Sequence, residues 1–468
     1  MVLRQDTQAP VNKRHNQTPW VDRRLLAHIE YIPIDSLTRY PGNPRKHPKR
    51  QQKKLDKNLS AFGIVLPVLV DAKGVVIAGE AVHASAKRLG YTEIPILRID
   101  HLSETDIKAL RIALNRLAEL SETDEEKLAL EFQALLEIDY DIELTGYDNA
   151  EADLIIEHAF APTSSTPVDD VPGLEEEAVS QLGDLWVLDE HLVFCGDARD
   201  PEAYKTVLQG RQARMVITDP PYNVRVQGNV CGSGSIKHDE FVMASGEMSD
   251  EEFRAFLEAF IRNLIQSSAS GSLHYLFMDW RHLRTLQEVC DKYYSAQINL
   301  CVWVKTNGGM GGLYRSQHEL IVVYKNGTAP HVNNVQLGRY GRNRSNKWEY
   351  EGANSMSPER RADLALHPTV KPVAMIADAI KDASNRGNLI LDPFLGSGTV
   401  VIACEQTGRI CAGLELDPKF VDVIIRRWQA FTGGQARHAA TGMTFDQMAD
   451  LRQGKTLLLP PPAAGGEV

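Results

Sequence analysis

Residues 388–403 read Asn388-Leu-Ile-Leu-Asp392-Pro-Phe394-Leu-Gly396-Ser-Gly398-Thr399-Val-Val-Ile-Ala403. The apolar run before Asp392 predicts a buried strand, the glycines predict a turn, and the apolar run after Thr399 predicts a helix. Glycines at such a turn let a ligand approach the backbone closely and let the helix pack against the strand. The stretch therefore predicts an α/β fold with a ligand-binding turn at the end of a strand.

A candidate ribose-binding acid lies downstream of this turn. Residues 410–414 predict the next strand, and Glu415 follows at its tip, 23 positions after Asp392. An acid about 20 residues after such a turn is where a ribose diol is usually held. The Gly-x-Gly-x-x-Gly spacing of NAD sites is missing, because Val401 stands where the third glycine would be.

A second stretch, Asp219-Pro220-Pro221-Tyr222, directly follows the apolar run Met215-Val216-Ile217. Two prolines cannot continue a strand ladder, so the chain must leave the sheet there, at the end of a strand where α/β sheets bind ligands. Asp219 and the carbonyl of Pro220 can accept hydrogen bonds from the exocyclic amine of a nucleobase, and Tyr222 offers a ring for stacking. A solvated turn is the alternative, because Asp and Pro are common turn residues.

Together the two motifs resemble the amino-group DNA methyltransferases that use S-adenosylmethionine, over residues 181–435, and residues 367–372 match the family segment before the cofactor strand. The order of the motifs is that of the β group. The resemblance implies a Rossmann-like, mostly parallel sheet and no metal. It assigns catalysis and base binding to Asp219, Pro220, Pro221 and Tyr222. It assigns cofactor contacts to Asp392, Phe394, Gly396, Gly398, Thr399, Glu415, Lys371 and Asp197.

The reaction implied by this resemblance is methylation of the N6 amine of adenine in DNA, on a base that has left the helix. The aspartate at position 219 favours adenine, whereas N4-cytosine methylation uses the same geometry and stays open as an alternative. A covalent C5-cytosine mechanism is disfavoured because the chain has no Pro-Cys dipeptide. A non-enzymatic partition protein and an enzyme that methylates an amine in protein or RNA also stay open as interpretations.

A candidate target-recognition region spans residues 328–362, between the two motifs. It interleaves cations with aromatic residues, a composition that suits phosphates and unstacked bases. The predicted DNA-binding residues are Arg339, Arg342, Arg344 and Lys347, with Tyr340, Trp348 and Tyr350 among them. A plain loop is the alternative interpretation of this region.

Residues 29–105 carry a second resemblance, to the N-terminal α+β domain of ParB and sulfiredoxin proteins. It rests on Asn43-Pro44-Arg45, the strands at 67–71 and 74–79, a helix ending at Lys87-Arg88-Leu89-Gly90, and Ile94-Pro95-Ile96. Ala81 and Val82 replace the two arginines of the ParB nucleotide box, and no cysteine precedes Cys195. DNA binding or assembly, without nucleotide hydrolysis, is therefore the expectation for this domain.

The ParB-like domain also contains a predicted cationic helix. Between residues 45 and 57 the chain has seven cations against one acid, Asp56, a local sum of +6. Such a face suits a phosphate backbone, and a merely solvated face is the alternative. The cations are Arg45, Lys46, Lys49, Arg50, Lys53, Lys54 and Lys57.

The remaining segments complete the predicted organisation. Residues 106–160 form a helical extension, in which the repeated Leu-Ser-Glu-Thr-Asp at 102–106 and 120–124 predicts two helices, each capped by its serine. A third helix is predicted at 151–160. The acidic, proline-containing segment 161–180 is predicted to be a linker that cannot bury a core. Residues 1–28 and 436–468 are predicted to be a flexible N-terminus and a C-terminal tail.

Whole-chain properties narrow the class of protein. The 468 residues suggest roughly three domains. No run approaches ~18 apolar residues, and the first residues lack the apolar stretch of a signal peptide. The six cysteines have no Cys-x-x-Cys spacing. The net charge of −11 does not exclude DNA, because binding depends on local patches. We expect a cytoplasmic enzyme of prophage or restriction-modification type that acts on double-stranded DNA, with a homodimer as a further expectation.

Overall fold

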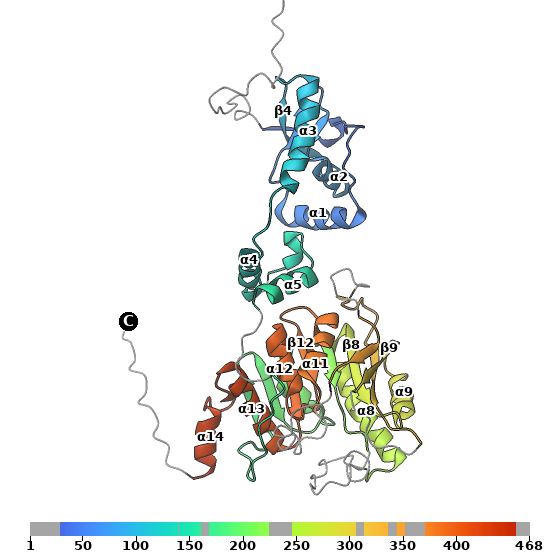
Figure 1. The fold of residues 1–468 in the computed structure, drawn as a ribbon, viewed down its shortest axis with the longest axis vertical. Coiled ribbons are helices and arrows are strands. Elements are labelled where there is room, and N and C mark those ends of the chain that lie inside the picture. Colours follow the sequence, from blue (N-terminus) through green and yellow to red (C-terminus); the bar gives the residue numbers. More distant parts are fainter. Residues whose placement is uncertain are drawn as a thin grey trace, which may run out of the picture. The chain divides into compact units, whose positions relative to one another are not determined.

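The computed structural model of the protein describes residues 29–138, 140–160, 168–223, 246–305, 313–335, 344–351 and 370–454. The chain divides into two compact units, residues 1–160 and residues 161–468. Both units mix helices and strands (Figure 1). The predicted α/β class is therefore confirmed for both parts of the chain.

The N-terminal unit is built on a four-stranded mixed sheet in the order β1-β4-β2-β3. Its strands are β1 (Glu30–Pro33), β2 (Val68–Asp71), β3 (Val76–Ala78) and β4 (Glu93–Ile99). The helices α1 (Lys49–Phe62) and α2 (Glu80–Arg88) accompany the sheet. Alternate residues of β2 and β4, among them Val68, Val70, Ile94 and Ile96, are fully buried in its core. This is the α+β domain that the resemblance to ParB predicted.

Three helices follow the sheet: α3 (Glu104–Glu119), α4 (Glu125–Glu137) and α5 (Asn149–Ala159), with the short 3-10 helix η3 (Ile142–Thr145) before α5. Ser103 caps α3 as predicted, since its side chain accepts from the backbone of Asp106. The prediction that Ser121 caps the next helix is wrong. Its hydroxyl donates to Ala118 O at the end of α3, and Asp124 caps α4.

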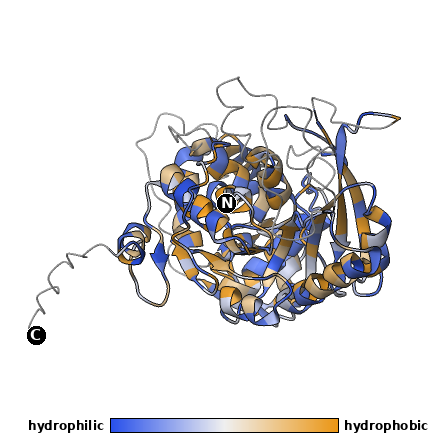
Figure 2. Cartoon of the chain, turned by 90° about the horizontal axis from the view of Figure 1, so that it is seen from below, coloured by the Kyte–Doolittle hydropathy of each residue, from blue (hydrophilic) through white to orange (hydrophobic). Residues whose placement is uncertain are grey.

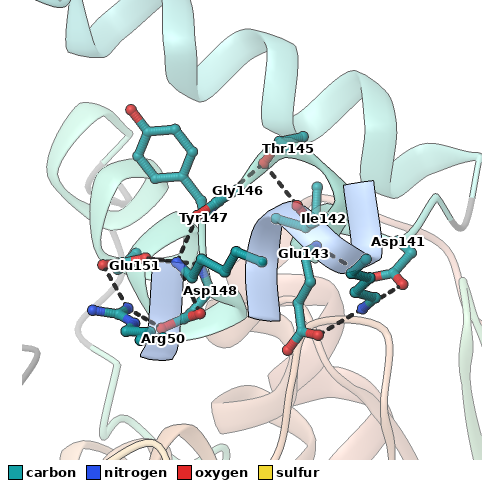
Figure 3. Close-up of polar contacts among 11 residues, drawn as sticks. Arg50, Asp141, Ile142, Glu143, Thr145, Gly146, Tyr147, Asp148 and Glu151 are labelled. Atoms are coloured by element: carbon teal, nitrogen blue, oxygen red, sulfur yellow. Dashed lines mark hydrogen bonds and ion pairs between the residues drawn. The ribbon is translucent and has the colours of Figure 1, made fainter. Parts of the chain in front are cut away.

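The predicted cationic helix is α1, which ends at Gly63 with a positive φ of 72°. Acids of η3 and the start of α5 contact its cationic face (Figure 3). Arg50 and Lys54 both pair with Asp148 and Glu151, and the Lys54 Nζ to Glu151 Oε2 distance is 3.2 Å. Lys57 Nζ pairs with Asp141 at 2.7 Å and with Glu143 at 2.6 Å. Part of the face predicted for DNA is thus used inside the unit, whereas Lys46, Lys49 and Lys53 are exposed.

A ten-stranded sheet organises the C-terminal unit, in the order β11-β9-β10-β8-β7-β12-β13-β6-β5-β14. The five central strands, β8 to β6 in that order, run parallel to one another, and antiparallel pairs flank them. The strands are β5 (Leu185–Leu188), β6 (His191–Cys195), β7 (Ala213–Thr218), β8 (Ser268–Met278), β9 (Ala296–Val304), β10 (His318–Lys325), β11 (Lys347–Glu349), β12 (Leu389–Asp392), β13 (Ile410–Glu415) and β14 (Arg437–His438). The parallel centre agrees with the predicted Rossmann-like sheet.

Helices cover both faces of this sheet. In β7, Met215 and Ile217 belong to one core cluster and Val216 belongs to the other, as the two-residue period of a strand requires. The first cluster includes residues of α11 (Val373–Ala383), α12 (Thr399–Thr407), α13 (Pro418–Thr432) and α14 (Phe445–Arg452). The second includes residues of α6 (Pro201–Leu208), α8 (Asp250–Ser267) and α9 (Leu283–Cys290). Figure 2 shows both orange and blue residues on these helices, the pattern of helices that pack by one face.

Two predicted boundaries are wrong in the described residues. The C-terminal tail was expected from residue 436, but β14 pairs with β5, and Phe445 and Met448 of α14 are buried in the first cluster. The linker was expected to stay outside any core, yet its last part docks on the C-terminal unit. Asp169 accepts from the backbone of Val373 at the start of α11, and Val179 is buried. Asp169 of the linker therefore accepts a backbone hydrogen bond and Glu175 pairs with Arg426, contacts that composition alone does not reveal.

Three further observations on the described residues concern membrane spans, metal sites and cysteines. Among the described residues, no helix is both long enough and apolar enough to cross a membrane. That same part of the chain contains no cluster of three or more His, Cys, Asp or Glu side chains suited to a metal ion. The five cysteines that the structure describes are buried and unbridged.

Candidate active site

The site lies where three neighbouring parallel strands end. In the sheet, β12 has β7 on one side and β13 on the other, and all three run in the same direction. Asp219 follows β7, while Asp392 and Glu415 are the last residues of β12 and β13. Topology therefore brings the two sequence motifs to one edge of the sheet, where α/β proteins bind ligands.

A direct hydrogen bond joins the two motifs. Thr218, the last residue of β7, donates from Oγ1 to Asp392 Oδ1 at 2.6 Å, and the backbone of Phe394 donates to the same oxygen at 3.0 Å. Burial raises the pKa of Asp392 to about 7, although both hydrogen bonds oppose this rise. Asp392 is 3% exposed, so it holds the turn against the neighbouring strand from inside the protein.

The turn after Asp219 is fixed by its own side chains. Tyr222 OH donates to Asp219 Oδ1, and Pro220 is buried beneath the turn. Asn223 adopts a left-handed conformation with φ of 52°. Its Oδ1 accepts from the backbone of Met248 at 3.2 Å, and its Nδ2 donates to Met248 O at 2.9 Å. These bonds direct the chain away from the sheet directly after Tyr222.

Lys371 lies against the Asp219 carboxylate. Its Nζ pairs with Asp219 Oδ2 and lies 3.1 Å from Glu319 Oε2. Its side chain is 7% exposed and near the rings of Tyr222, Phe277 and Trp303. The resemblance assigned Lys371 to the cofactor, whereas the structure places its ammonium beside the predicted catalytic carboxylate.

Glu319, the second residue of β10, was not among the predicted site residues. Its Oε2 contacts Lys371 and also accepts from Tyr222 OH at 3.3 Å, and its Oε1 pairs with Lys305. Burial would raise the pKa of Glu319, but the charges of Lys371 and Lys305 prevail and lower it to about 2. Nothing in the local sequence singles out this glutamate, because only the antiparallel pairing of β10 with β8 brings it to the edge where β7 ends.

The glycine turn after β12 leaves room beside its backbone. A Cβ built on Gly396, with φ of 52°, would meet nothing within 4 Å. At Gly398, with φ of 80°, it would lie 3.0 Å from Ile424. The first glycine therefore leaves space for a ligand, and the second allows close packing of α12 on α13.

Glu415 is connected to this turn. Gly396 N donates to its Oε2 at 2.8 Å, and Asp417 N donates to its Oε1 at 2.9 Å. Burial raises the pKa of Glu415 to about 7, although these backbone donors oppose the rise. An ionised carboxylate has about four lone-pair sites, so each oxygen can still accept from one more donor.

The other predicted cofactor residues have structural partners. Phe394 packs edge-on against Phe260, with 5.1 Å between ring centroids. Thr399 is buried, and Arg427 Nη1 contacts its Oγ1 at 3.2 Å. Asp197 follows β6 and pairs with Arg199 at 2.6 Å. Thr399 thus contacts the protein interior, whereas Asp197 lies at the sheet edge next to the end of β13.

Arg427 of α13 is a second residue that the sequence analysis missed. It is 3% exposed, donates to Ser397 O at 3.0 Å and to Val168 O at 3.2 Å, and so supports the glycine turn from behind. Burial lowers its pKa to about 10.

The predicted DNA-binding residues are not all available for DNA. Arg339 and Arg342 lie outside the described residues. Arg344 is paired with Asp378 at 2.7 Å and with Asp382 at 3.0 Å. Lys347 is 59% exposed in its side chain and pairs with Glu349. Trp348, which the composition suggested for base stacking, is 5% exposed and packs on Tyr275 in the core.

Two family profiles match the chain. Residues 213–426 match the DNA methylase family of the N6/N4 type. Residues 126–182 match the ParB-methyltransferase helix-turn-helix domain. The second match covers α4, η3 and α5, the segment that the sequence analysis described only as a helical extension.

Individual similar proteins are more distant. The type II methyltransferase M.HpaI of Haemophilus parainfluenzae is 24% identical over 236 residues, which are 47% of this chain and 69% of that protein. A crystal structure of the M1.HpyAVI–SAM complex aligns over 50% of this chain and 98% of its own, at 18% identity and a TM-score of 0.36. Truncated ParB from Caulobacter crescentus, complexed with CTP-gamma-S, covers 29% of this chain and 81% of its own, at 20% identity and a TM-score of 0.26.

Proposed function

We propose that this chain, in which a ParB-like domain is fused to an amino-group DNA methyltransferase domain, methylates the N6 amine of adenine in double-stranded DNA. One observation carries the proposal. Asp219 directly follows β7, the glycine turn directly follows the neighbouring strand β12, and the Thr218–Asp392 hydrogen bond joins the ends of these two strands. Base-binding and cofactor-binding motifs are then adjacent, as direct transfer between two ligands requires.

S-adenosylmethionine is the cofactor of this proposal. The residues present fit it, because Gly396 leaves open space at the turn and Glu415 retains acceptor capacity for two ribose hydroxyls. Asp197 lies at the neighbouring strand end and Phe394 closes the turn on the side of α8. Asp392 and Thr399 support the turn through the buried contacts given above.

The chain's own residues would orient the target amine. Asp219 and the Pro220 carbonyl accept its two hydrogens, and the Tyr222 ring stacks on the base, which must be outside the helix. S-adenosylmethionine, when bound, would supply a methyl group on a positive sulfur. The amine lone pair would form the N–C bond as the C–S electrons go to sulfur, and the amine would release one proton. Asp219 accepts from this amine in the proposal, so its carboxylate is the group that would receive that proton. Burial raises its pKa, which makes it a better base, although Lys371 opposes the rise.

N4-cytosine methylation is the second candidate, because the matching family covers both amines. The same acceptors would hold the cytosine amine. An aspartate at position 219 favours adenine, since the amino-group enzymes that act on cytosine more often carry serine there.

The deciding experiment identifies the modified nucleoside. The full-length protein is incubated with methyl-labelled S-adenosylmethionine and mixed-sequence duplex DNA, which is then digested and separated into nucleosides. We expect label in N6-methyldeoxyadenosine. Label in N4-methyldeoxycytidine would select the second candidate. If the protein binds S-adenosylmethionine but leaves the DNA unlabelled, methyl transfer to DNA is refuted.

A further inference from the structure

Glu319 and Asp219 share the same two hydrogen-bond donors. The Tyr222 hydroxyl lies within hydrogen-bond distance of Asp219 Oδ1 and of Glu319 Oε2 and can donate its one hydrogen to either, and Lys371 Nζ contacts Asp219 Oδ2 and Glu319 Oε2. Two donors therefore bridge two carboxylates in a closed ring. Lys305 completes the group by pairing with the remaining oxygen of Glu319.

This ring matters because both oxygens of Asp219 are already engaged. An amine that donates to Asp219 must share an oxygen with Tyr222 or Lys371, or replace one of them. A buried donor left without a partner is costly, and a buried ammonium without a counter-charge is more so. Glu319 Oε2 is within reach of both donors, so either can leave Asp219 and stay paired.

The charges support the same interpretation. Two carboxylates, Asp219 and Glu319, face two ammonium groups, Lys371 and Lys305, so the four groups sum to zero. The side chains of Lys371 and Glu319 are 7% and 14% exposed, so water screens the pair between them little, whereas Asp219 and Lys305 are 28% and 32% exposed.

Building on the proposed function, we propose that Glu319 is a positioning residue for methyl transfer. It keeps Lys371 and Tyr222 in place while Asp219 changes from binding them to binding the amine of the target base. Glu319 itself touches neither the base nor the cofactor in this scheme, and it acts only through Asp219 and its two donors.

The test is the pH dependence of single-turnover methylation by the full-length protein. Glu319→Gln should lower the rate by about 10²-fold, the size of effect that loss of positioning produces. At saturating cofactor, where the pH dependence of cofactor binding does not contribute, it should also move the acidic limb of the profile to lower pH. Glu319 raises the pKa of Asp219 by repulsion, so its removal lets Asp219 remain ionised in more acidic solution.

A second variant predicts the opposite shift. Lys305→Gln removes the positive charge that partly neutralises Glu319, so the negative charge of Glu319 repels the Asp219 carboxylate more strongly. The pKa of Asp219 should therefore rise, and the acidic limb should move to higher pH. Glu319→Asp keeps the charge, so its limb should stay at the wild-type pH even where the rate falls. A purely structural defect has no reason to produce shifts of opposite sign.

The control is Glu288→Gln, the same change on α9, where Glu288 pairs with Arg254 and Arg284 away from the site. It should leave the rate and profile unchanged. Equilibrium cofactor binding shows that each variant is folded, and Lys305→Gln decides the matter if Glu319→Gln does not fold. The inference is overturned if Glu319→Gln keeps the wild-type rate and the wild-type position of the acidic limb. It is also overturned if Glu319→Gln and Lys305→Gln move the acidic limb in the same direction. A wild-type enzyme that labels no DNA would instead refute the proposed function.

Discussion

Two groups of ion pairs in this chain differ in how far water reaches their charges. In the N-terminal unit, Arg50 and Lys57 are 41% and 39% exposed where they meet the acids of η3 and α5. At the candidate site, Lys371 is 7% exposed. Exposed pairs contribute ~0–1 kcal/mol each and weaken with salt. Removing one partner of a buried group costs several times more, because the other charge remains without compensation.

The difference in solvent exposure suits the two groups of ion pairs to different roles. The buried group holds carboxylates in fixed orientations, as catalysis by positioning requires. The exposed group can exchange partners at little cost, so another polyanion can compete for its cations. The predictions that follow test this contrast, from the largest expected effect to the smallest.

The largest effect should come from Asp219→Asn, which keeps the side-chain size and removes the charge. We expect methylation to fall by about 10²–10³-fold, comparable to the loss of one preorganised group at a reacting centre. Cofactor affinity should change little, because Gly396 and Glu415 belong to a different turn. Single-turnover rates and equilibrium cofactor binding would be measured on the same preparation. Turnover at the wild-type rate would remove Asp219 from the mechanism.

Glu415→Ala should weaken S-adenosylmethionine by ~1.5–3 kcal/mol, the range for hydrogen bonds to a charged group. In the wild type, affinity should also fall as pH drops through about 7, because burial raises the pKa of Glu415 to that value and the neutral acid is a poorer acceptor. Calorimetric titration across pH would measure both effects. Asp417→Ala is the matched control. If Glu415→Ala leaves the affinity unchanged, Asp417 is the residue that would accept from the ribose hydroxyls.

Arg344 and Lys347 form a matched pair in the predicted recognition region. Arg344→Gln removes the cation that pairs with both Asp378 and Asp382, although Asp378 keeps its pair with Lys381, and it should cost ~1–3 kcal/mol of folding free energy. Lys347→Gln should leave stability unchanged and, if Lys347 contacts DNA, lower the log–log salt slope of binding by about 0.9. Denaturant unfolding and salt-dependent DNA binding separate these outcomes. If Arg344→Gln lowers the salt slope of DNA binding and leaves stability unchanged, Arg344 contacts DNA and its ion pairs do not stabilise the fold.

Much of the fold and the centre of the site were predictable because the signals are local. The apolar run before Asp219 and the glycines after Asp392 report a strand end and a turn without any tertiary information, and both lie where they were predicted. Glu319 and Arg427 were missed because strand order and helix packing bring them to the site. Composition misled at Trp348, where an aromatic residue among cations packs in the core.

The same limit explains the cationic helix. The sequence shows seven cations between residues 45 and 57, but not that acids near 141–151 face them. Those acids belong to the segment that matches the ParB-methyltransferase helix-turn-helix domain. A net-charge count over α1 therefore overstates how much positive charge is available to DNA.

The last prediction pairs a modest loss of stability with a gain in DNA binding, from Asp148→Asn combined with Glu151→Gln. The double change removes two acidic partners from Arg50 and Lys54, whose side chains are 41% and 22% exposed, so we expect the unfolding free energy to change by at most ~1 kcal/mol per pair. DNA affinity should rise, and the salt slope should steepen by up to about 0.9 for each cation that gains a phosphate contact. Full-length protein would be titrated with duplex DNA at several salt concentrations.

The control for this last comparison is Glu125→Gln combined with Glu126→Gln, which removes the same charge from exposed positions at the start of α4. If long-range repulsion alone limited DNA binding, both double variants would gain affinity equally. A gain confined to Asp148 and Glu151 means that local pairing with α1 is what DNA must displace. Adding Arg50→Gln and Lys54→Gln to the first variant should then abolish the gain, because the released cations are the groups that would bind phosphate. Equal slopes in all of these proteins would mean that this face of α1 does not meet DNA.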